Sequence, residues 1–441
     1  MKNNMLTNGI RRALLASLLA SAALSAQAQD KPQSATPAKK DATTLDKIVV
    51  TEQSREQQLQ DVPIALQVVD ASTIDTTAAA TLGDLDSFIP GLEVSDGQPT
   101  QTRFKLRGLS TDDIGIGTDP TVGVYVDGVY AGRGGGTLLP FLDVERIEVL
   151  KGPQGTLFGR NTAAGAISII TRRPSQISEG RLRIRAGNND TAHIDGTLNA
   201  PINEHMALRI NALHDETGGW LRDSATGKRL DNGRNDALRV AFGWDISSTT
   251  RLLLSWDHEK MNQRSRPSIG IVDLDPNTGL PEFPANPAHY RNPFSMPAYT
   301  DVAGNDEKRD FDGSTLQLEH DFEWGQMTAT TAWRHYTTLN RTEEDATNKA
   351  YLYIDSNNIE NNTTWYQELK FSGTTDRLDW VAGASWFKEN GRQSSVVDLN
   401  SSSVDTAAMY ALGVPIFSVL QSVADMYQVP VQLLGKPWTE S

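Results

Sequence analysis

The residue types that most often carry chemistry are scattered along this chain without the spacing of a catalytic or metal site. Its seven histidines show no close ligand spacing such as HxxxH, and cysteine is absent. Zinc sites need several such ligands together. Neither a GxSxG nor a GxxxxGK[ST] motif occurs, so the nucleophile elbow and the phosphate loop of those types are missing. We predict no metal site and no cofactor.

Two other groups of residues might suggest anion binding or catalysis at first sight. The run Gly132-Arg-Gly-Gly-Gly136 has the composition of a phosphate cradle, but no helix start follows it, as phosphate binding at a helix N-terminus would require. Acidic pairs such as Asp112-Asp113 and Glu343-Glu344 are typical of solvated loops. We interpret the glycine run as a flexible loop and predict that the protein is not an enzyme.

Composition excludes further classes of protein. The 441 residues carry a formal net charge of −14, which argues against nucleic-acid binding. The mean hydropathy is −0.41, and past residue 30 no apolar run approaches the roughly 18 residues of a membrane helix. A role in a membrane would therefore have to use strands.

The N-terminus has the pattern of an export signal. Basic residues precede the apolar run Ala13–Leu24, and Ala26-Gln-Ala28 fits a small-x-small cleavage site. This pattern predicts a signal peptide over residues 1–28. The alternative is a membrane anchor, which the shortness of the apolar run disfavours. The polar stretch over residues 29–44 predicts a flexible linker in the periplasm.

The stretch from Val144 to Pro174 is the most informative part of the chain. Two strand-like runs, Ile147–Leu150 and Ala166–Ile170, flank four glycines and one proline. Glycine and proline disfavour helix interiors, so the pattern predicts a strand, tight turns and a second strand. With Phe104–Leu109 and Val124–Tyr130 upstream, this segment resembles the plug domain of TonB-dependent outer-membrane receptors.

The resemblance implies an organisation for the N-terminal half. Residues 52–175 would form the plug domain, and residues 45–51 resemble the TonB box, by which such receptors are pulled from the periplasm. Its β-branched residues favour an extended strand that adds to a partner's sheet; the alternative is an ordinary first plug strand. The resemblance makes TonB the partner of Asp46, Lys47, Ile48, Val49, Val50 and Thr51.

From Gly180 onwards, apolar and polar residues alternate in nine segments. Alternating segments of roughly ten residues with aromatics near their ends are typical of a transmembrane β-barrel. A soluble β-sandwich also alternates. Long links at Thr217–Asn235, Lys260–Asp312 and Leu339–Asn361, separated by short ones, favour the barrel, because its two rims differ in loop length.

We therefore predict an α+β plug domain followed by antiparallel transmembrane β-barrel strands over residues 176–441. Plugged transporter barrels have 22 strands, which would need about 550 residues after the plug. Only 261 residues follow Gly180. We expect the N-terminal part of a truncated receptor, with Ala407–Leu434 helical in a surface loop.

In the family, two basic plug positions face glutamates on the inner wall of the barrel. The resemblance assigns these positions to Arg107, in an arginine-glycine motif, and to Lys151, before glycine-proline. It also matches Glu368 to a family glutamate. Side-chain parity points both Glu368 and Glu319 inward. These four residues form the predicted plug–barrel lock; the alternative is that Glu368 is one of many polar lumen residues.

Ligand recognition, by the same resemblance, would lie on plug apices and outer loops. The loops around Thr111–Thr118, Gly132–Gly136 and Lys260–Asp312 are the expected places, because they offer charges and aromatic contact surface. The predicted ligand-binding residues are Asp112, Asp113, Arg133, Arg264, Arg266, Tyr290 and Phe294.

The expected function is active uptake of a scarce solute through the Gram-negative outer membrane. A ferric siderophore is the leading solute. The expected partners of the protein are TonB and outer-membrane lipid. A carbohydrate or cobalamin is an alternative solute. A passive channel or an adhesin is an alternative function. Scrambling the TonB box would distinguish active uptake from a channel, because it should abolish active uptake and leave a channel unaffected.

Overall fold

The computed structural model describes residues 49–50, 57–58, 65–273, 275–277, 286–302, 304–426, 432–433 and 436–437. All of them belong to one compact unit, Ile48–Ser441. The predicted signal peptide, the predicted linker and the TonB-box residues Asp46, Lys47, Ile48 and Thr51 lie outside the described residues.

The first domain is built around a five-stranded mixed sheet. Its strand order is β3 (Leu66–Asp70), β8 (Val144–Lys151), β9 (Gly165–Thr171), β6 (Val122–Val126) and β7 (Val129–Tyr130). Strands β6 and β9 run parallel and the other pairs run antiparallel. The predicted α+β domain with a mixed sheet is confirmed.

The core of this domain is apolar and lies on the central strands β8 and β9. Ile147, Val149 and Ile167 are fully buried there. Helix α2 (Ala71–Thr77) and the 3-10 helix η2 (Leu82–Phe88) cover the sheet with further apolar side chains. Thr81 begins η2 with a capping box to Asp84, in which side chain and backbone satisfy each other's hydrogen bonds.

Gly165 shows why the glycine-rich segment cannot accept larger residues everywhere. Its φ is +154°, and a Cβ atom there would lie 2.2 Å from the Leu150 carbonyl oxygen and 2.5 Å from Leu106 Cδ2. The backbone of β9 thus approaches β8 at a distance that only glycine permits.

Short elements complete the domain: β4 (Leu92–Ser95), η3 (Pro99–Gln101), β5 (Arg103–Leu106), η4 (Gly134–Gly136) and α3 (Gly155–Phe158). The prediction of a flexible loop at Gly132–Gly136 is wrong. Gly135 and Gly136 are buried, and a Cβ on either would lie within 2.9 Å of the Tyr336 ring. The glycines allow this segment to pack closely against the second domain.

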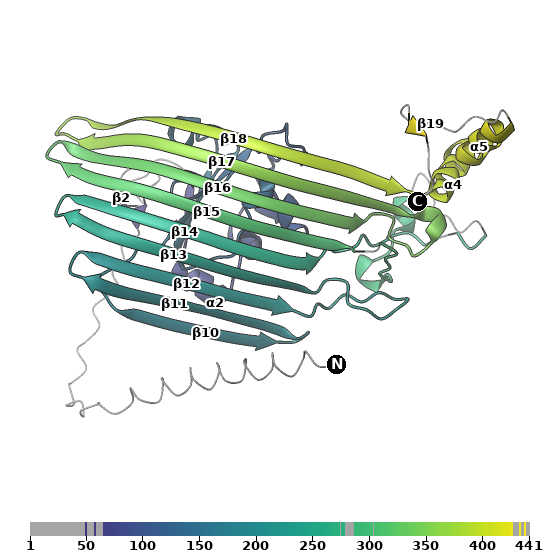
Figure 1. Ribbon diagram of the computed structural model, residues 1–441, viewed down its shortest axis with the longest axis horizontal. Coiled ribbons are helices and arrows are strands. Elements are labelled where there is room, and N and C mark those ends of the chain that lie inside the picture. Colours follow the sequence, from purple (N-terminus) through teal and green to yellow (C-terminus); the bar gives the residue numbers. More distant parts are fainter. Residues whose placement is uncertain are drawn as a thin grey trace, which may run out of the picture. The chain divides into compact units, whose positions relative to one another are not determined.

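The second domain is a nine-stranded antiparallel sheet in sequential order (Figure 1). The strands are β10 (Glu179–Gly187), β11 (Thr191–Asn203), β12 (Met206–Thr217), β13 (Gly233–Ser247), β14 (Thr250–Arg264), β15 (Asp306–Phe322), β16 (Gly325–Glu343), β17 (Ile354–Thr374) and β18 (Asp379–Leu399). They lengthen from 9 residues in β10 to 21 in β17 and β18. The nine predicted strands are confirmed.

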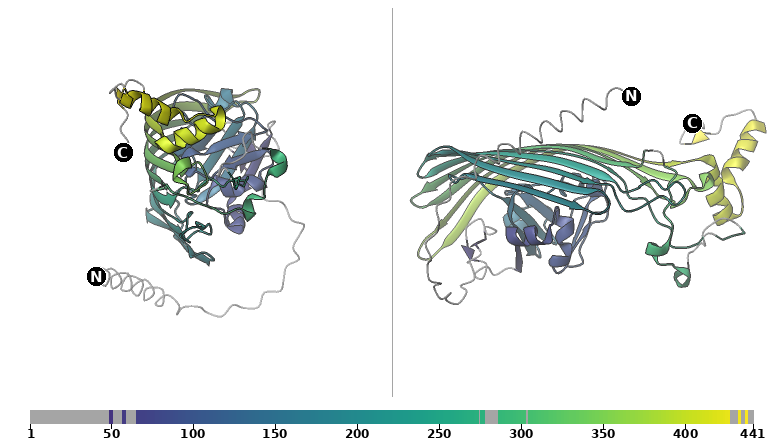
Figure 2. Two further views of the ribbon diagram at one scale, coloured as in Figure 1. Left: turned by 90° about the vertical axis from the view of Figure 1, so that its right-hand side faces the viewer. Right: turned by 90° about the horizontal axis from the view of Figure 1, so that it is seen from below.

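The two ends of this sheet differ. Tight turns follow Asn203, Ser247 and Phe322 at one end, and long loops follow Thr217, Arg264 and Glu343 at the other. The sheet curves, and the plug domain lies against its concave face (Figure 2).

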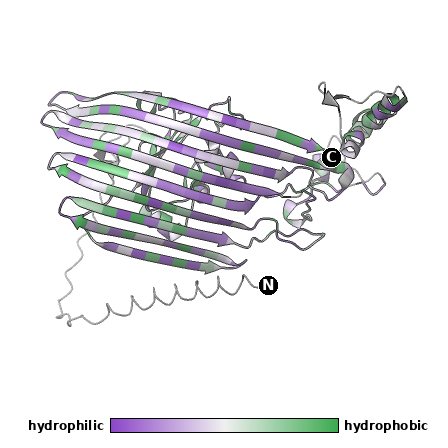
Figure 3. Ribbon diagram, viewed as in Figure 1, coloured by the Kyte–Doolittle hydropathy of each residue, from purple (hydrophilic) through white to green (hydrophobic). Residues whose placement is uncertain are grey.

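Side-chain parity separates the two faces of the curved sheet. Ala237, Arg239 and Ala241 are buried toward the plug, whereas Leu254 and Trp256 on the next strand are exposed on the convex face. The strands become more hydrophilic toward the long loops (Figure 3). A convex face that is apolar near the short turns and polar beyond them suits a sheet that crosses lipid and extends past it.

Two aromatic groups bound the apolar part of the convex face. Trp333 and Trp365 are cross-strand partners, and Trp256 lies in the same row through Ser314. Phe322 and Trp324 stack near the short turns, with ring centroids 4.8 Å apart. Ser314 and Phe322 are eight residues apart on β15, about 27 Å along the strand. A strand tilt of about 35–45° reduces this to roughly 19–22 Å along the barrel axis, somewhat less than the apolar band of about 25 Å in such barrels.

Beyond β18 the chain is helical. Helices α4 (Ser401–Leu412) and α5 (Ile416–Met426) pack together, separated by Gly413-Val414-Pro415. The predicted helix over Ala407–Leu434 therefore begins earlier, is interrupted, and gives way to the short paired strands β19 (Gln432–Leu433) and β20 (Lys436–Pro437). Among the residues that the structure describes, no helix has the length and apolar character needed to span a membrane.

Candidate functional site: the interface between plug and wall

Arg239 of β13 joins the plug to the concave face of the sheet, which we call the wall. The residue is 4% exposed, and its guanidinium donates 2.6 Å hydrogen bonds to Asp127 of the plug and to Asp257 of the wall. A buried charge needs such partners, because it has lost its hydration. The wall carboxylate and the plug carboxylate together neutralise its charge.

Arg309 of β15 makes the densest contact between wall and plug. It is 2% exposed and pairs with Glu259 of the wall at 2.6 and 2.8 Å. Its remaining N–H groups donate to the plug carbonyl oxygens of Pro99, Gly135 and Leu138, at 3.1, 3.2 and 2.7 Å. Wall charges neutralise the arginine, and the plug backbone completes its hydrogen bonds.

Two further wall residues repeat this design. Arg209 of β12 pairs with the plug residue Asp143 and with Glu179 of β10. Glu307 of β15, fully buried, accepts hydrogen bonds from the backbone N–H and the hydroxyl of Thr100, at 2.8 and 2.7 Å. We call Arg209, Arg239 and Arg309 the wall arginines. The interface that they form is polar and hydrogen-bonded.

The predicted lock residues are only partly brought together. Glu319 faces the plug, but its partner is Arg173, which donates two 2.7 Å hydrogen bonds from just after β9. Glu368 faces the plug residue Tyr125, whose pKa is raised by burial and also by Tyr130 and Glu368. In the described part of the chain, neither Arg107 nor Lys151 forms an ion pair with either glutamate.

Lys151 has a partner within the plug instead. Its Nζ donates to Gln67 Oε1 at 2.9 Å and to the Pro90 carbonyl oxygen at 2.8 Å. Burial lowers the pKa of Lys151, and the neighbouring charge of Arg107 lowers it further. The two basic plug residues thus lie near each other, but the lock as predicted must be corrected, because the Lys151 ammonium ties β8 to β3 within the plug and does not pair with a wall glutamate.

The plug apex and strand β17 enclose a cavity of about 60 Å³, which we call the apex pocket. Two predicted ligand-binding residues, Asp113 and Arg133, line it. Asp113 accepts hydrogen bonds from Thr118 Oγ1 and the Gly115 N–H. Both bonds lower the pKa of Asp113, and the bond from Thr118 has the larger effect. The other residues that line the apex pocket include Thr100, Gln101, Thr102, Arg103, Phe104, Thr111, Ile114, Thr121, Gly132, Thr137, Asn358 and Glu360.

The remaining predicted ligand residues lie apart from this pocket. Asp112 accepts a hydrogen bond from Ser110, and Arg264 pairs with Asp306 across the strands at 3.0 Å. Arg266 is exposed, as are Tyr290 (48%) and Phe294 (89%) in the long loop after β14. They present an open surface and do not converge on the pocket.

The wall arginines and their partners were missed by the sequence analysis. Arg209, Arg239 and Arg309 each stand at an inward position of an alternating strand, so parity could have marked them. Their partners Asp127 and Asp143 could not have been found in this way, because they lie in plug turns with φ of 51° and 55°. Only the docked structure brings these groups together.

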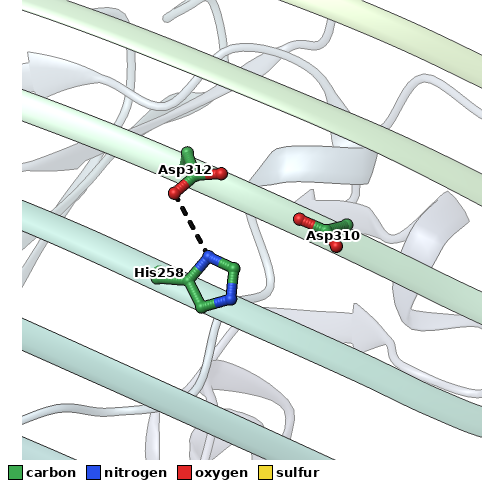
Figure 4. A group of neighbouring side chains, drawn as sticks. All are labelled: His258, Asp310 and Asp312. Atoms are coloured by element: carbon green, nitrogen blue, oxygen red, sulfur yellow. Dashed lines mark hydrogen bonds and ion pairs between the residues drawn. The ribbon is translucent and has the colours of Figure 1, made fainter.

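Among the residues that the structure describes, two groups of side chains have ligand atoms close enough to hold a metal ion: His258, Asp310 and Asp312, and Asp301, Glu343 and Asp345. In the first, His258 Nδ1 lies 3.1 Å from Asp312 Oδ1, while Asp310 is exposed (Figure 4). His258 also stacks on Trp256. The histidine and the acids stand more than fifty residues apart in sequence, so motif spacing could not reveal them.

Of the predicted TonB box, the structure describes Val49 and Val50. They form β1 (Val49–Val50), which pairs antiparallel with β2 (Gln57–Gln58). The extended conformation agrees with their β-branched side chains.

Comparison with known proteins identifies the class. Residues 58–166 match the family described as the TonB-dependent Receptor Plug Domain. The ferrioxamine receptor of Yersinia enterocolitica is 28% identical over 49% of this chain and 28% of its own length. The vitamin B12 transporter BtuB of Vibrio vulnificus is 30% identical over 42% of this chain and 30% of its own length.

Solved structures agree on the fold. The ferric yersiniabactin uptake receptor FyuA from Yersinia pestis superposes with a TM-score of 0.64 and 20% identity, over 77% of this chain and 50% of that one. The siderophore receptor PiuA from Acinetobacter baumannii gives 0.62 and 18%, over 79% and 48%.

Residues 58–166 thus carry a plug domain of TonB-dependent receptors, and the chain as a whole shares the fold of the solved outer-membrane receptors named here. It spans less than a third of the length of the curated relatives named here.

Proposed function

We propose that this chain is part of a receptor for TonB-dependent uptake of a ferric siderophore through the outer membrane. The observation that carries the proposal is the plug docked on the concave wall by buried, hydrogen-bonded charges such as Arg239 and Arg309. A transporter needs a stopper that holds when idle and can move when pulled. Water can resolvate charged groups as they separate, whereas an apolar seal would resist wetting.

The relatives support the class of solute. Their names refer to ferrioxamine, to a metal bound by pseudopaline, to a catecholate siderophore and to vitamin B12, and FyuA is named for ferric yersiniabactin. Most of these are iron or metal chelates. On this basis a ferric siderophore is the proposed solute, and cobalamin or a carbohydrate is the alternative.

Energy would enter through the TonB box. Backbone hydrogen bonding of Val49 and Val50 to a partner strand does not depend on side-chain identity, which suits a segment that must transmit force. In the structure this pair already belongs to the local pairing with Gln57 and Gln58. We propose that TonB replaces or extends this pairing.

Uptake under iron limitation tests the proposal. Bacteria that carry the receptor with Asp46–Thr51 scrambled should bind the radiolabelled ferric siderophore at the surface but fail to accumulate it. A scramble of equal length in the predicted linker, over residues 35–40, is the matched control and should transport normally. Equal accumulation by both variants would identify a passive channel, and surface attachment of cells without any accumulation would identify an adhesin.

A further inference from the structure

We infer that His258, Asp310 and Asp312 form a binding site for one divalent transition-metal ion of the Zn²⁺ class on the convex face of the wall. The three side chains come from the neighbouring strands β14 and β15 (Figure 4). One ligand atom from each side chain lies within 4.8 Å of the other two. Close spacing along the chain, on which the prediction of no metal site was based, does not detect ligands that come from two strands.

An ion at this site would not be the transported solute. The three residues stand at outward positions of their strands, in the same parity as Leu254 and Trp256. The plug lies on the opposite, concave face of the sheet (Figure 2). The site is therefore separated from the interface between plug and wall.

Two of the three groups already have nearly the spacing that a zinc ion requires. Zinc lies about 2.0–2.2 Å from histidine nitrogens and carboxylate oxygens, so two ligands of a tetrahedral site are about 3.3–3.6 Å apart. His258 Nδ1 and Asp312 Oδ1 are 3.1 Å apart. A neutral imidazole whose Nδ1 carries no proton can thus share an ion with this carboxylate after a shift of a few tenths of an ångström.

The backbone and a neighbouring aromatic ring hold the ligands in place. His258 and Asp312 are cross-strand partners, and Asp310 stands two residues from Asp312 on the same face of β15. The imidazole stacks on the Trp256 indole, with ring centroids 5.8 Å apart. Stacking restricts rotation of the imidazole ring. A site that is ordered before the ion arrives loses less entropy on binding.

The carboxylate of Asp310 is available to an ion. Lys260 lies opposite Asp310 in the register of β14 and β15, yet among the residues that the structure describes these two form no ion pair. Asp310 is exposed, so its side chain can turn toward the other two ligands. The two carboxylates together balance the two positive charges of the ion.

The mixture of one imidazole and two carboxylates selects the class of ion. Calcium and magnesium prefer oxygen ligands alone, whereas imidazole suits zinc and similar transition metals. Three protein ligands leave at least one position of a tetrahedral site open. His258 lies two residues beyond Trp256 toward the long loops, about 7 Å along the strand. The open position is therefore outside the apolar part of the convex face, where water can fill it.

The ion would link the two strands at the base of a long wall loop. Strand β14 ends at Arg264 and β15 begins at Asp306, each six residues from a ligand of the site. An ion that binds the folded chain and not the unfolded chain stabilises the fold. Binding should therefore raise the thermal stability of the wall.

Equilibrium dialysis of the purified chain in neutral detergent, with radioactive Zn²⁺ as the probe, tests the inference. The native chain should bind Zn²⁺ saturably near neutral pH. His258→Phe keeps a ring on Trp256 but lacks the ligating nitrogen. It should weaken binding at least about ten-fold, because even the loss of a residue behind the ligands of a metal site can do so. Asp312→Asn keeps the shape of the side chain without its charge and should weaken binding similarly.

His214→Phe is the matched control. His214 also stands at an outward position and lies between two acids, with Asp236 2.7 Å from its Nδ1 and Glu216 3.6 Å from its Nε2. Because these acids flank opposite nitrogens of the ring, they cannot share one ion with it. This variant should bind Zn²⁺ as the native chain does.

Thermal unfolding followed by circular dichroism supplies a second readout and shows whether each variant keeps its strands. Zn²⁺ should raise the Tm of the native chain and of His214→Phe, but not that of His258→Phe or Asp312→Asn. An excess of Mg²⁺ should not displace Zn²⁺. Absence of saturable Zn²⁺ binding to the native chain, an equal loss in His214→Phe, or displacement by Mg²⁺ would overturn the inference. Because neither TonB nor a siderophore is present, the result is independent of the uptake experiment.

Discussion

At the scale of single residues, the wall arginines carry the contact between the two domains. Each is nearly inaccessible to water. The charge of Arg239 is neutralised by the plug residue Asp127 and the wall residue Asp257, and that of Arg309 by the wall residue Glu259. Removal of one member of a buried pair leaves the other charge unsolvated, which costs more than the pair itself contributes.

Arg239→Met should therefore destabilise the docked plug by about 3–5 kcal/mol, because Asp127 and Asp257 lose their shared cation. The measurement is the denaturant concentration at which the plug becomes sensitive to protease. Lys105→Gln is the control, since Lys105 and Glu93 pair at 3.0 Å on the surface, and it should change stability by less than about 1 kcal/mol. Similar midpoints for both variants would contradict a docking role for Arg239.

The same residues mark what the sequence could predict of the site. The alternation of β15 and β17 predicts that Glu319 and Glu368 point inward, since it depends only on backbone parity. The partner of an inward charge depends on how two separately folded units meet. For that reason Arg173, which ends a strand of the plug, takes the place that Arg107 and Lys151 were expected to fill.

At the scale of elements, helix α2 begins at Asp70, an aspartate whose pKa is lowered in the folded protein. Asp70 accepts hydrogen bonds from the Thr73 N–H at 2.8 Å and from Ser72 Oγ at 3.0 Å. The Thr73 N–H is the main cause that lowers the pKa of Asp70 below its usual 3.8. This contribution to stability is present above pH 3.8 and is lost as the pH falls through the folded pKa.

Asp70→Ala should lower stability by about 1 kcal/mol at pH 7, because the cap of α2 is lost. The difference between native and variant chains should shrink as the pH drops below the folded pKa, where the native carboxyl is protonated. Urea unfolding of both chains at pH 7 and pH 2.5 measures this. A difference that stays constant with pH would show that the carboxylate charge is not what stabilises the helix start.

Two glycines of the plug can be used to test whether steric crowding requires a glycine at a given position. Gly165→Ala should destabilise the plug by more than about 3 kcal/mol, because its φ is positive and the new Cβ would overlap the Leu150 carbonyl oxygen. Gly155→Ala is the matched control: it lies in α3, nothing approaches its Cβ position, and it should be neutral or slightly stabilising. Thermal unfolding followed by circular dichroism compares the two, and equal shifts would refute the steric account.

Strand positions were the most predictable elements. Periodicity located all nine wall strands and the central plug strands, because each buries one or both faces in a regular pattern. Segments without periodicity were predicted less well. Gly132–Gly136 was expected to be flexible, yet its lack of side chains lets it pack under Tyr336, and composition does not distinguish these two uses of glycine.

At the scale of the whole molecule, the proposed function makes the contacts between plug and wall a barrier to passive entry. Glu319→Gln should raise the entry of a bulky antibiotic such as vancomycin, because it weakens the two hydrogen bonds to Arg173. Glu368→Gln should leave entry near the native level, since Glu368 pairs weakly with Lys370 of its own strand at 3.9 Å. Antibiotic susceptibility of cells with each variant tests this, and the reverse order would restore Glu368 as the residue that holds the plug.

The gradual lengthening of the wall strands has a consequence for access from outside. From β10 to β18 the strands gain 12 residues, about 40 Å of extended backbone. The rim is therefore oblique, low over the first strands and high over the last. A bulky protein such as a bacteriocin or an antibody would be blocked by the long strands on one side of the wall and admitted over the short strands on the other. Its angle of approach is therefore restricted before it contacts any recognition residue.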